Sequence, residues 1–138
     1  MEDIEHLKAL CEGKLPDLLG IVLAEVKPFA VNAHLEVAEA HLAPNGFLHA
    51  GAIVSLADTA CGVGCMASLP EAATGFTTIE LKSNHLATVR EGVIDCVAEA
   101  VHQGRTTQVW DAEVRCRASH KVLALFRCTQ MVMYSPPA

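Results

Sequence analysis

The sequence predicts an α+β domain in which a curved antiparallel sheet of five or six strands wraps around one long buried helix. An apolar segment of small residues at about 48–69 is the expected helix, and Pro70 ends it. Two short segments with alternating polarity come before it, and long segments rich in β-branched residues follow it. A helix with so little polar surface is covered on most sides only if the sheet curls around it.

The first part of the chain predicts a short helix and a strand hairpin. Ile4, Leu7 and Leu10 would form the apolar face of an amphipathic helix within residues 1–11, and a further helical turn is expected at 15–20. Residues 21–27 and 30–37 read as two strands joined by a turn at Pro28, so we expect them to pair.

The central apolar segment carries one formal charge between Phe47 and Leu69, the carboxylate of Asp58. An ionised carboxylate among apolar residues is unfavourable unless it is paired, kept protonated or used in chemistry. The segment is long enough to cross a membrane. Its mid-segment Asp58, its glycines and the lack of a flanking basic cluster favour a buried helix in a domain without membrane contact.

After Pro70 the chain reads as strands to its end. The expected strands are 74–86, 93–102, 106–116 and 122–134, and the last three are joined by short turns into an antiparallel meander. No linker or repeat interrupts the sequence, so residues 1–138 are expected to form a single domain.

Composition narrows the possible functions. The net charge is −6 with a pI of about 5.6, and no basic stripe is present, which argues against a nucleic-acid partner. Six cysteines without a C-x-x-C pair indicate free thiols in a reducing compartment, and the acidic N-terminus lacks a signal-peptide pattern, so a cytoplasmic location is expected. The seven histidines are scattered without metal-ligand spacing, so no metal is expected.

Two motifs carry a family resemblance. Residues 46–51, G-F-L-H-A-G, resemble a G-x-x-H-G-G motif, and residues 56–60, L-A-D-T-A, follow at the matching spacing. Weaker similarities lie at 78–81, 102–105 and 122–127. The ordered set resembles the hot-dog-fold acyl-CoA thioesterases, most closely the phenylacetate-degradation (PaaI-like) group, over nearly all of the chain after about residue 15.

The resemblance implies a hot-dog domain that hydrolyses an acyl-CoA, with coenzyme A as part of the substrate and no separate cofactor. It implies paired subunits, often assembled into a homotetramer. The chain departs from the pattern at two positions. Ala43 stands where the family usually has Asn, with Asn45 nearby, and Ala50 replaces the first glycine of H-G-G but keeps its backbone N–H.

The chemistry expected from these residues is thioester hydrolysis. The N–H of Ala50 or Gly51 would stabilise the oxyanion at the positive end of the helix, and Asp58 would act as general base or nucleophile. Ala50 and Asp58 lie eight residues apart, roughly 12 Å along a helix. They cannot reach the same thioester carbon, so an active enzyme requires a homodimer whose sites combine groups of both subunits.

Several other residues are candidates with structural alternatives. Asp58 could be a paired structural carboxylate, and His49 could shape the helix start or act in catalysis. Asn45 could take the role of the Asn missing at position 43. The substrate-binding candidates are Gly51, Thr77, Thr78 and, for coenzyme A phosphates, Arg105.

The acyl group is expected to be aryl, arylacetyl or medium-chain. A hot-dog dehydratase or hydratase is the alternative enzyme, and a dimer that binds acyl-CoA without turning it over is the non-catalytic alternative. The placement of His49 before the helix and of Asp58 within it favours the thioesterase.

Overall fold

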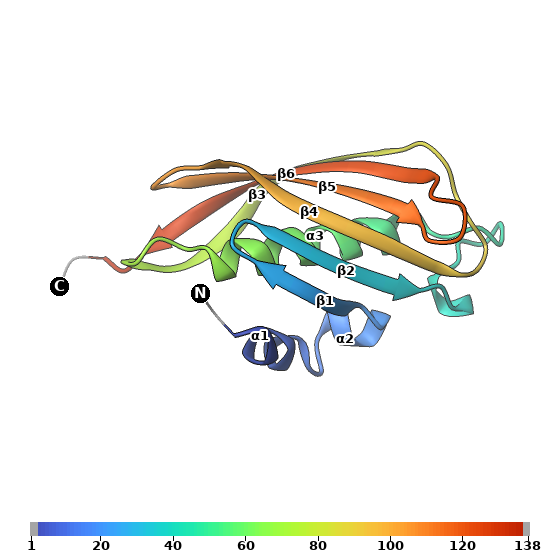
Figure 1. The fold of residues 1–138 in the computed structure, drawn as a ribbon, viewed down its shortest axis with the longest axis horizontal. Coiled ribbons are helices and arrows are strands. Elements are labelled where there is room, and N and C mark those ends of the chain that lie inside the picture. Colours follow the sequence, from blue (N-terminus) through green and yellow to red (C-terminus); the bar gives the residue numbers. More distant parts are fainter. Residues whose placement is uncertain (1–2, 137–138) are drawn as a thin grey trace.

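Two short helices precede the sheet in the computed structural model, which describes residues 3–136 (Figure 1). Helix α1 (Ile4–Cys11) buries Leu7 and contacts β1, while α2 (Leu15–Leu19) packs on the central helix. Pro16 lies in the first turn of α2, where its missing N–H costs nothing, and Gly20 ends the helix with a φ of 79°. The short N-terminal helix is thus confirmed, with α2 as the predicted further turn.

The sheet has six antiparallel strands in the order β1-β2-β4-β5-β6-β3. The β1–β2 hairpin and the β4–β5–β6 meander match the predictions. Strand β3, however, lies beside β6 and forms the edge opposite β1. The strands are β1 (Val22–Lys27), β2 (Ala30–Glu36), β3 (Ala73–His85), β4 (Val93–Gln103), β5 (Thr107–Cys116) and β6 (Val122–Tyr134).

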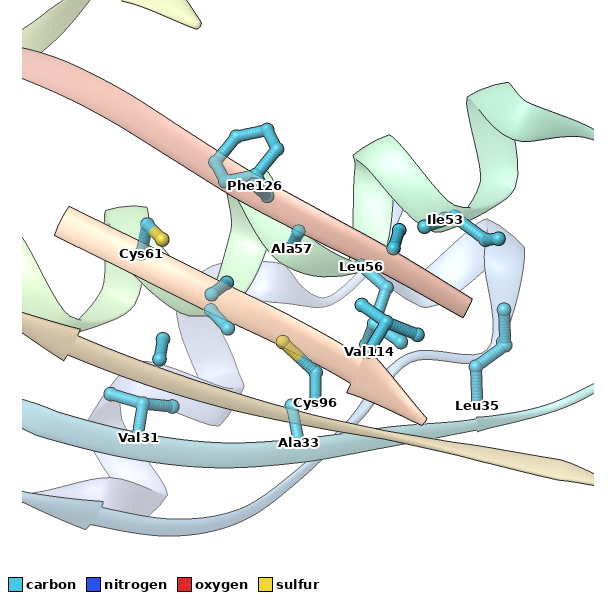
Figure 2. Packing of buried hydrophobic residues seen from close by; sticks show 14 of the residues in the cluster. Val31, Ala33, Leu35, Ile53, Leu56, Ala57, Cys61, Cys96, Val114 and Phe126 are labelled. Atoms are coloured by element: carbon cyan, nitrogen blue, oxygen red, sulfur yellow. The ribbon is translucent and has the colours of Figure 1, made fainter. Parts of the chain in front are cut away.

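Helix α3 (Ala50–Ala67) lies along the inner face of this sheet and contacts all six strands. Its length and apolar composition alone would suit a membrane span, but more than half of it is buried in the fold. Figure 2 shows Leu56, Ala57 and Cys61 of α3 close to the inward side chains of β2, β4, β5 and β6. This is the predicted hot-dog fold: a sheet curled around one buried helix.

Helix α3 is shorter than the expected segment because capping groups fix both ends. His49 is its N-cap, so Leu48 lies outside the helix and forms an isolated bridge with Leu42. At the other end, the Ser68 hydroxyl donates to the Gly64 carbonyl at 2.6 Å. The helix therefore starts and ends two residues inside the predicted bounds.

The indole of Trp110 on β5 sets the closest approach between helix and sheet. A Cβ added at Gly64 would lie 2.3 Å from the Trp110 ring, so only glycine fits there. The indole N–H donates to Gln108 Oε1 at 2.7 Å, which satisfies the fully buried Trp side chain. The small residues of α3 thus allow the close packing that the sequence predicted.

Strand β3 contains a bulge at Ile79 that changes which side chains face inward. Before the bulge, Thr78 pairs with the inward-facing Gln130; after it, Leu81 pairs with the inward-facing Cys128. Ile79 is the extra residue between these two pairs and is 52% exposed.

The six cysteines are free thiols, and four of them are buried in the core. Burial raises the pKa of Cys65 and Cys96 to about 12. Contact with Cys128 and burial raise the pKa of Cys61 still further. These thiols are protonated at neutral pH, which supports their interpretation as small core residues.

Candidate active site

The start of α3 presents one free backbone N–H beside a capped one. The ring nitrogen Nδ1 of His49 accepts a hydrogen bond from Gly51 N–H at 2.7 Å. Within residues 3–136, Ala50 N–H, at the first helical position, donates to no other group. Of the two amides considered from the sequence, Ala50 is therefore the one available to an oxyanion.

Capping by Nδ1 also fixes the His49 tautomer. A neutral imidazole that accepts at Nδ1 carries its proton on Nε2. His49 is solvent-exposed in the single chain. His49 thus shapes the helix start, as one of its two predicted roles requires.

The loop before α3 is held in place by two other segments. The buried ring of His41 accepts from Ala38 N–H at 2.9 Å and lies 2.7 Å from the Leu19 carbonyl, which ties the loop to the end of α2. Leu48 N–H donates to the Val89 carbonyl at 2.8 Å, so the segment after β3 lies at the helix start. The Ala50 amide therefore follows a loop held in place by these bonds, and His41 is a structural residue that the sequence did not single out.

Asn45 has a turn role in this loop. Its side-chain oxygen accepts from Phe47 N–H at 3.1 Å, an Asx-type turn. Ala43 N–H donates to the Phe47 carbonyl at 2.7 Å, and the Ala43 carbonyl accepts from Gly46. The predicted part of Asn45 in catalysis stays a prediction.

Asp58 lies two turns into α3, on the helix side that faces β3. Gly62, one turn further on, marks this side because a Cβ there would lie 3.3 Å from the Phe76 ring of β3. Asp58 Oδ1 is buried and has no hydrogen-bond partner within residues 3–136. Burial raises the pKa of the Asp58 carboxyl above its ordinary value. A structural carboxylate would be paired, so the unpaired oxygen favours the chemical role.

Thr77 and Thr78 face opposite sides of the sheet. Thr78 points to the α3 side and donates to Gln130 Oε1 at 2.6 Å. Thr77 is exposed and pairs with Met131 on the outer side. The structure therefore brings Thr78, and not Thr77, to the same side as Asp58.

The arginines occupy three different environments. Arg127 forms a two-bonded ion pair with Asp111 on the outer face of the sheet. Arg105 lies at the β4–β5 turn, 5.9 Å above the Tyr134 ring centroid, and its carbonyl accepts from the Tyr134 hydroxyl. Arg90 stacks on Phe47 before the helix start, with its guanidinium carbon 4.2 Å from the ring centroid.

Two hollows lie away from Ala50 and Asp58. One of about 660 Å³ is on the outer face of the sheet and is lined by charged residues that include Asp111 and Arg127. Another of about 240 Å³ lies between α1, α2 and β1 and reaches Thr59. Neither is lined by Asp58. Within the described part of the chain, no three His, Cys, Asp or Glu side chains are grouped so that they could hold a metal ion.

Comparison with known proteins bears on the family of this chain. A profile of the thioesterase superfamily matches residues 45–122. The 1,4-dihydroxy-2-naphthoyl-CoA hydrolase of Listeria monocytogenes is 35% identical over 115 residues, which cover 83% of this chain and 92% of that protein. The Escherichia coli protein of the same name is 30% identical over 113 residues, with coverage of 80% and 81%.

Solved structures give the same result at the level of the fold. A mutant thioesterase from Pseudomonas aeruginosa superposes with a TM-score of 0.90 at 31% identity, covering 98% of this chain and 96% of that one. A thioesterase from Haemophilus influenzae has a TM-score of 0.89 at 28% identity, with coverage of 97% and 92%. With its hot-dog fold, its unpaired helix carboxylate and these relatives, the chain belongs to the thioesterase superfamily and is a thioester hydrolase.

Proposed function

We propose that the enzyme hydrolyses an acyl-CoA with an aryl, arylacetyl or medium-chain acyl group. The observation that carries the proposal is Asp58 Oδ1, which is buried on an otherwise uncharged helix and has no hydrogen-bond partner within residues 3–136. The naphthoyl-CoA hydrolases among the relatives support an aromatic acyl group.

In the proposed reaction, Asp58 takes a proton from water as the water oxygen attacks the thioester carbon. The Ala50 N–H stabilises the resulting oxyanion, the C–S bond breaks, and the coenzyme A thiolate takes up a proton. The raised pKa of Asp58 suits a general base, because a base works best when its pKa approaches the working pH. The alternative is attack by the Asp58 carboxylate itself, which forms an anhydride that water then hydrolyses.

The two groups come from different subunits in this proposal. Eight residues of helix separate Ala50 and Asp58 by roughly 12 Å. The edge strand β3 exposes two apolar side chains, Ile79 to 52% and Leu81 to 43%. Leu81 is on the side that faces α3, and Ile79 is the bulge residue two positions before it. An open strand edge with apolar side chains is a suitable surface for a second copy, and a two-fold pair would contain two equivalent sites.

We further propose that two dimers form a homotetramer and that the enzyme works in the cytoplasm. The six free thiols support a reducing compartment. The mass measured by light scattering would distinguish a dimer from a tetramer.

The test is thiol release from a panel of aryl-, arylacetyl- and straight-chain acyl-CoAs by wild type and by Asp58→Asn. We expect Asp58→Asn to lose about 10²–10⁴-fold in turnover while it still binds substrate. Near-normal turnover by Asp58→Asn would end the catalytic assignment. A wild type that binds acyl-CoA without hydrolysing it would favour the binding-dimer alternative, and one that dehydrates or hydrates the acyl chain would favour the dehydratase.

A single turnover in ¹⁸O-labelled water separates the two Asp58 roles. A nucleophilic carboxylate gains the label when water attacks the Asp58 carbonyl carbon of the anhydride, and a second turnover then moves that label into the product. A general base leaves Asp58 unlabelled, and the label is found only in the released acid.

The proposed phosphate contact of Arg105 has a matched control in this chain. Arg105→Ala should raise KM for an acyl-CoA more than for the corresponding pantetheine thioester, which lacks the nucleotide phosphates. Arg127→Ala removes an arginine already paired with Asp111 and should change both values equally little. Equal effects of Arg105→Ala on the two substrates would remove its phosphate role.

A further inference from the structure

We infer that Gln130 is a positioning residue for hydrolysis: its buried amide holds the Thr78 hydroxyl so that the Thr78 oxygen accepts a hydrogen bond from the attacking water. The inference rests on the proposed function and adds to it a residue that neither the sequence motifs nor the comparisons point to.

The hydrogen bond between Thr78 and Gln130 has a fixed direction. Thr78 Oγ1 and Gln130 Oε1 are 2.6 Å apart, and Gln130 is fully buried. An amide oxygen can only accept, so the Thr78 hydroxyl must donate to it. The hydroxyl proton of Thr78 is therefore used in the bond to buried Gln130. The lone pairs of Thr78 Oγ1 remain able to accept a hydrogen bond from a donor on the α3 side.

The orientation of the Gln130 amide group is fixed. Its Nε2 is directed at Cys128 Sγ, 3.5 Å away. Its neighbour across the sheet, Gln108, uses Oε1 for the Trp110 indole and Nε2 for the Ser68 carbonyl. Gln108 therefore leaves the Gln130 carbonyl to Thr78. Each of the two buried amides thus has its own partners.

Thr78 on β3 lies level with Asp58 on α3. Strand β3 runs back along α3, because Phe76 lies against Gly62 and the segment after the strand meets the helix start. Two strand residues from Phe76 to Thr78 span roughly 7 Å. Four helix residues from Gly62 to Asp58 span roughly 6 Å. Asp58 and Thr78 are therefore at about the same height on facing elements, and their side chains are not bonded to each other.

The chemistry follows from these positions. A water between the two side chains donates one hydrogen to the Asp58 carboxylate and the other to Thr78 Oγ1. Asp58 removes the first proton as the water oxygen attacks the carbonyl carbon. The second stays on the new carboxyl group, and its hydrogen bond to Thr78 orients the lone pair of the attacking oxygen. A hydroxyl free to rotate would instead donate to the water oxygen or to Asp58, which lowers the nucleophilicity of either.

The experiment is a double-mutant cycle with Thr78→Val, Gln130→Met and the two combined, measured on the best acyl-CoA of the panel. Each single change should lower kcat about 5- to 10-fold, the size of one hydrogen bond, with KM within about twofold. The combined variant should be no slower than Thr78→Val alone, because Gln130 acts only through Thr78. Gln108→Met removes a neighbouring buried amide that does not touch Thr78, and should lower thermal stability while leaving kcat unchanged.

Three results would overturn the inference: an unchanged kcat in Gln130→Met, multiplied effects in the combined variant, or an equal loss of kcat in Gln108→Met. If Gln130→Met does not fold, Gln130→Asn withdraws the acceptor by one methylene and should give the same loss. A wild type without hydrolysis, or an active Asp58→Asn, would count against the proposed function instead.

Discussion

Asp58 combines an unfavourable environment with a chemical use. Its carboxyl is partly desolvated, and one oxygen has no partner within residues 3–136. Such a group destabilises the folded chain when it is ionised and is retained only if the ionised form is needed. We therefore expect the Asp58 carboxylate to support activity and to lower the stability of the folded protein.

We predict that Asp58→Asn raises the melting temperature at neutral pH. The folded pKa of Asp58 is raised above its unfolded value, so the folded state binds the proton more tightly. Its ionisation therefore lowers the free energy of unfolding as pH rises through the window between the two pKa values, and the cost persists above it. Thermal melts from pH 4 to 8 should show the mutant's advantage shrinking as the pH falls. A mutant that is less stable than wild type at pH 8 would contradict the assignment of Asp58 as a destabilising group.

His49 offers a second prediction at the scale of one residue. His49→Ala removes the acceptor that caps Gly51 N–H and should cost about 0.5–2 kcal/mol of stability. His49→Asn keeps a side-chain acceptor suited to an N-cap and should retain most of that stability. Chemical denaturation of the two variants checks the order. Equal losses would show that Nδ1 does not stabilise the helix start.

The sequence revealed only some of the site residues. Asp58 could be singled out because it is the one charge in an apolar segment, and Ala50 because a helix start was expected there. The hydrogen bond from Gly51 to His49 depends on a ring orientation that no pattern encodes. Gln130 did leave a signal, since it falls on the same alternation as Phe126, Cys128 and Val132 on β6, where an apolar residue is expected.

At the scale of the elements, the contact between α3 and β5 is the tightest in the core. Gly64→Ala would place a Cβ 2.3 Å from Trp110, and we expect a net loss of about 1–3 kcal/mol despite the better helix propensity of Ala. Gly62→Ala is the matched control, because its Cβ would lie 3.3 Å from the mobile end of a single Phe76 ring. Urea unfolding followed by the fluorescence of Trp110, the sole tryptophan, measures both. A Gly64→Ala protein as stable as wild type would mean that the indole can move.

The strands and the central helix could be predicted from the sequence, but which strands pair with each other could be predicted only in part. Periodicity and turn residues located all six strands and the helix to within a few residues. Adjacent strands joined by tight turns also had to pair. The pairing of β3 with β6 joins segments far apart in the chain, and no local pattern distinguishes it from a pairing with β4.

At the scale of the whole molecule, the shared site predicts complementation between inactive subunits. Ala50→Pro removes only the N–H at the first helical position, where proline is tolerated, and His49 already has the extended conformation that precedes proline, with φ −68° and ψ 134°. We expect this variant to lose about 10²–10³-fold in kcat. Refolding it together with Asp58→Asn should restore about a quarter of wild-type activity, because mixed dimers contain one intact site.

Recovery is impossible if both groups serve the same subunit's site. Each variant refolded alone provides the baseline, and a mixture no more active than the two baselines would contradict the shared site.

The edge of β3 predicts how the proposed dimer can be broken. Leu81→Lys places a charge on an exposed apolar side chain of this edge and should shift sedimentation towards the monomer, with loss of turnover. Leu125→Lys, on the outer face and 45% exposed, controls for added charge. A monomeric Leu81→Lys protein with full activity would end the two-subunit mechanism.

The bulge at Ile79 means that β3 has no single inside and outside along its length. Phe76 and Thr78 face α3 on even positions, and Leu81 and Ser83 do so on odd ones. Deleting Ile79 would put the two halves of β3 in the same alternation. Either Phe76 and Thr78 or Leu81 and Ser83 would then face the opposite side of the sheet. In the proposed enzyme, Ile79 thus separates the part of β3 beside Asp58 from the part that would offer an edge to a second copy. Insertions and deletions at Ile79 should therefore be far less tolerated than substitutions.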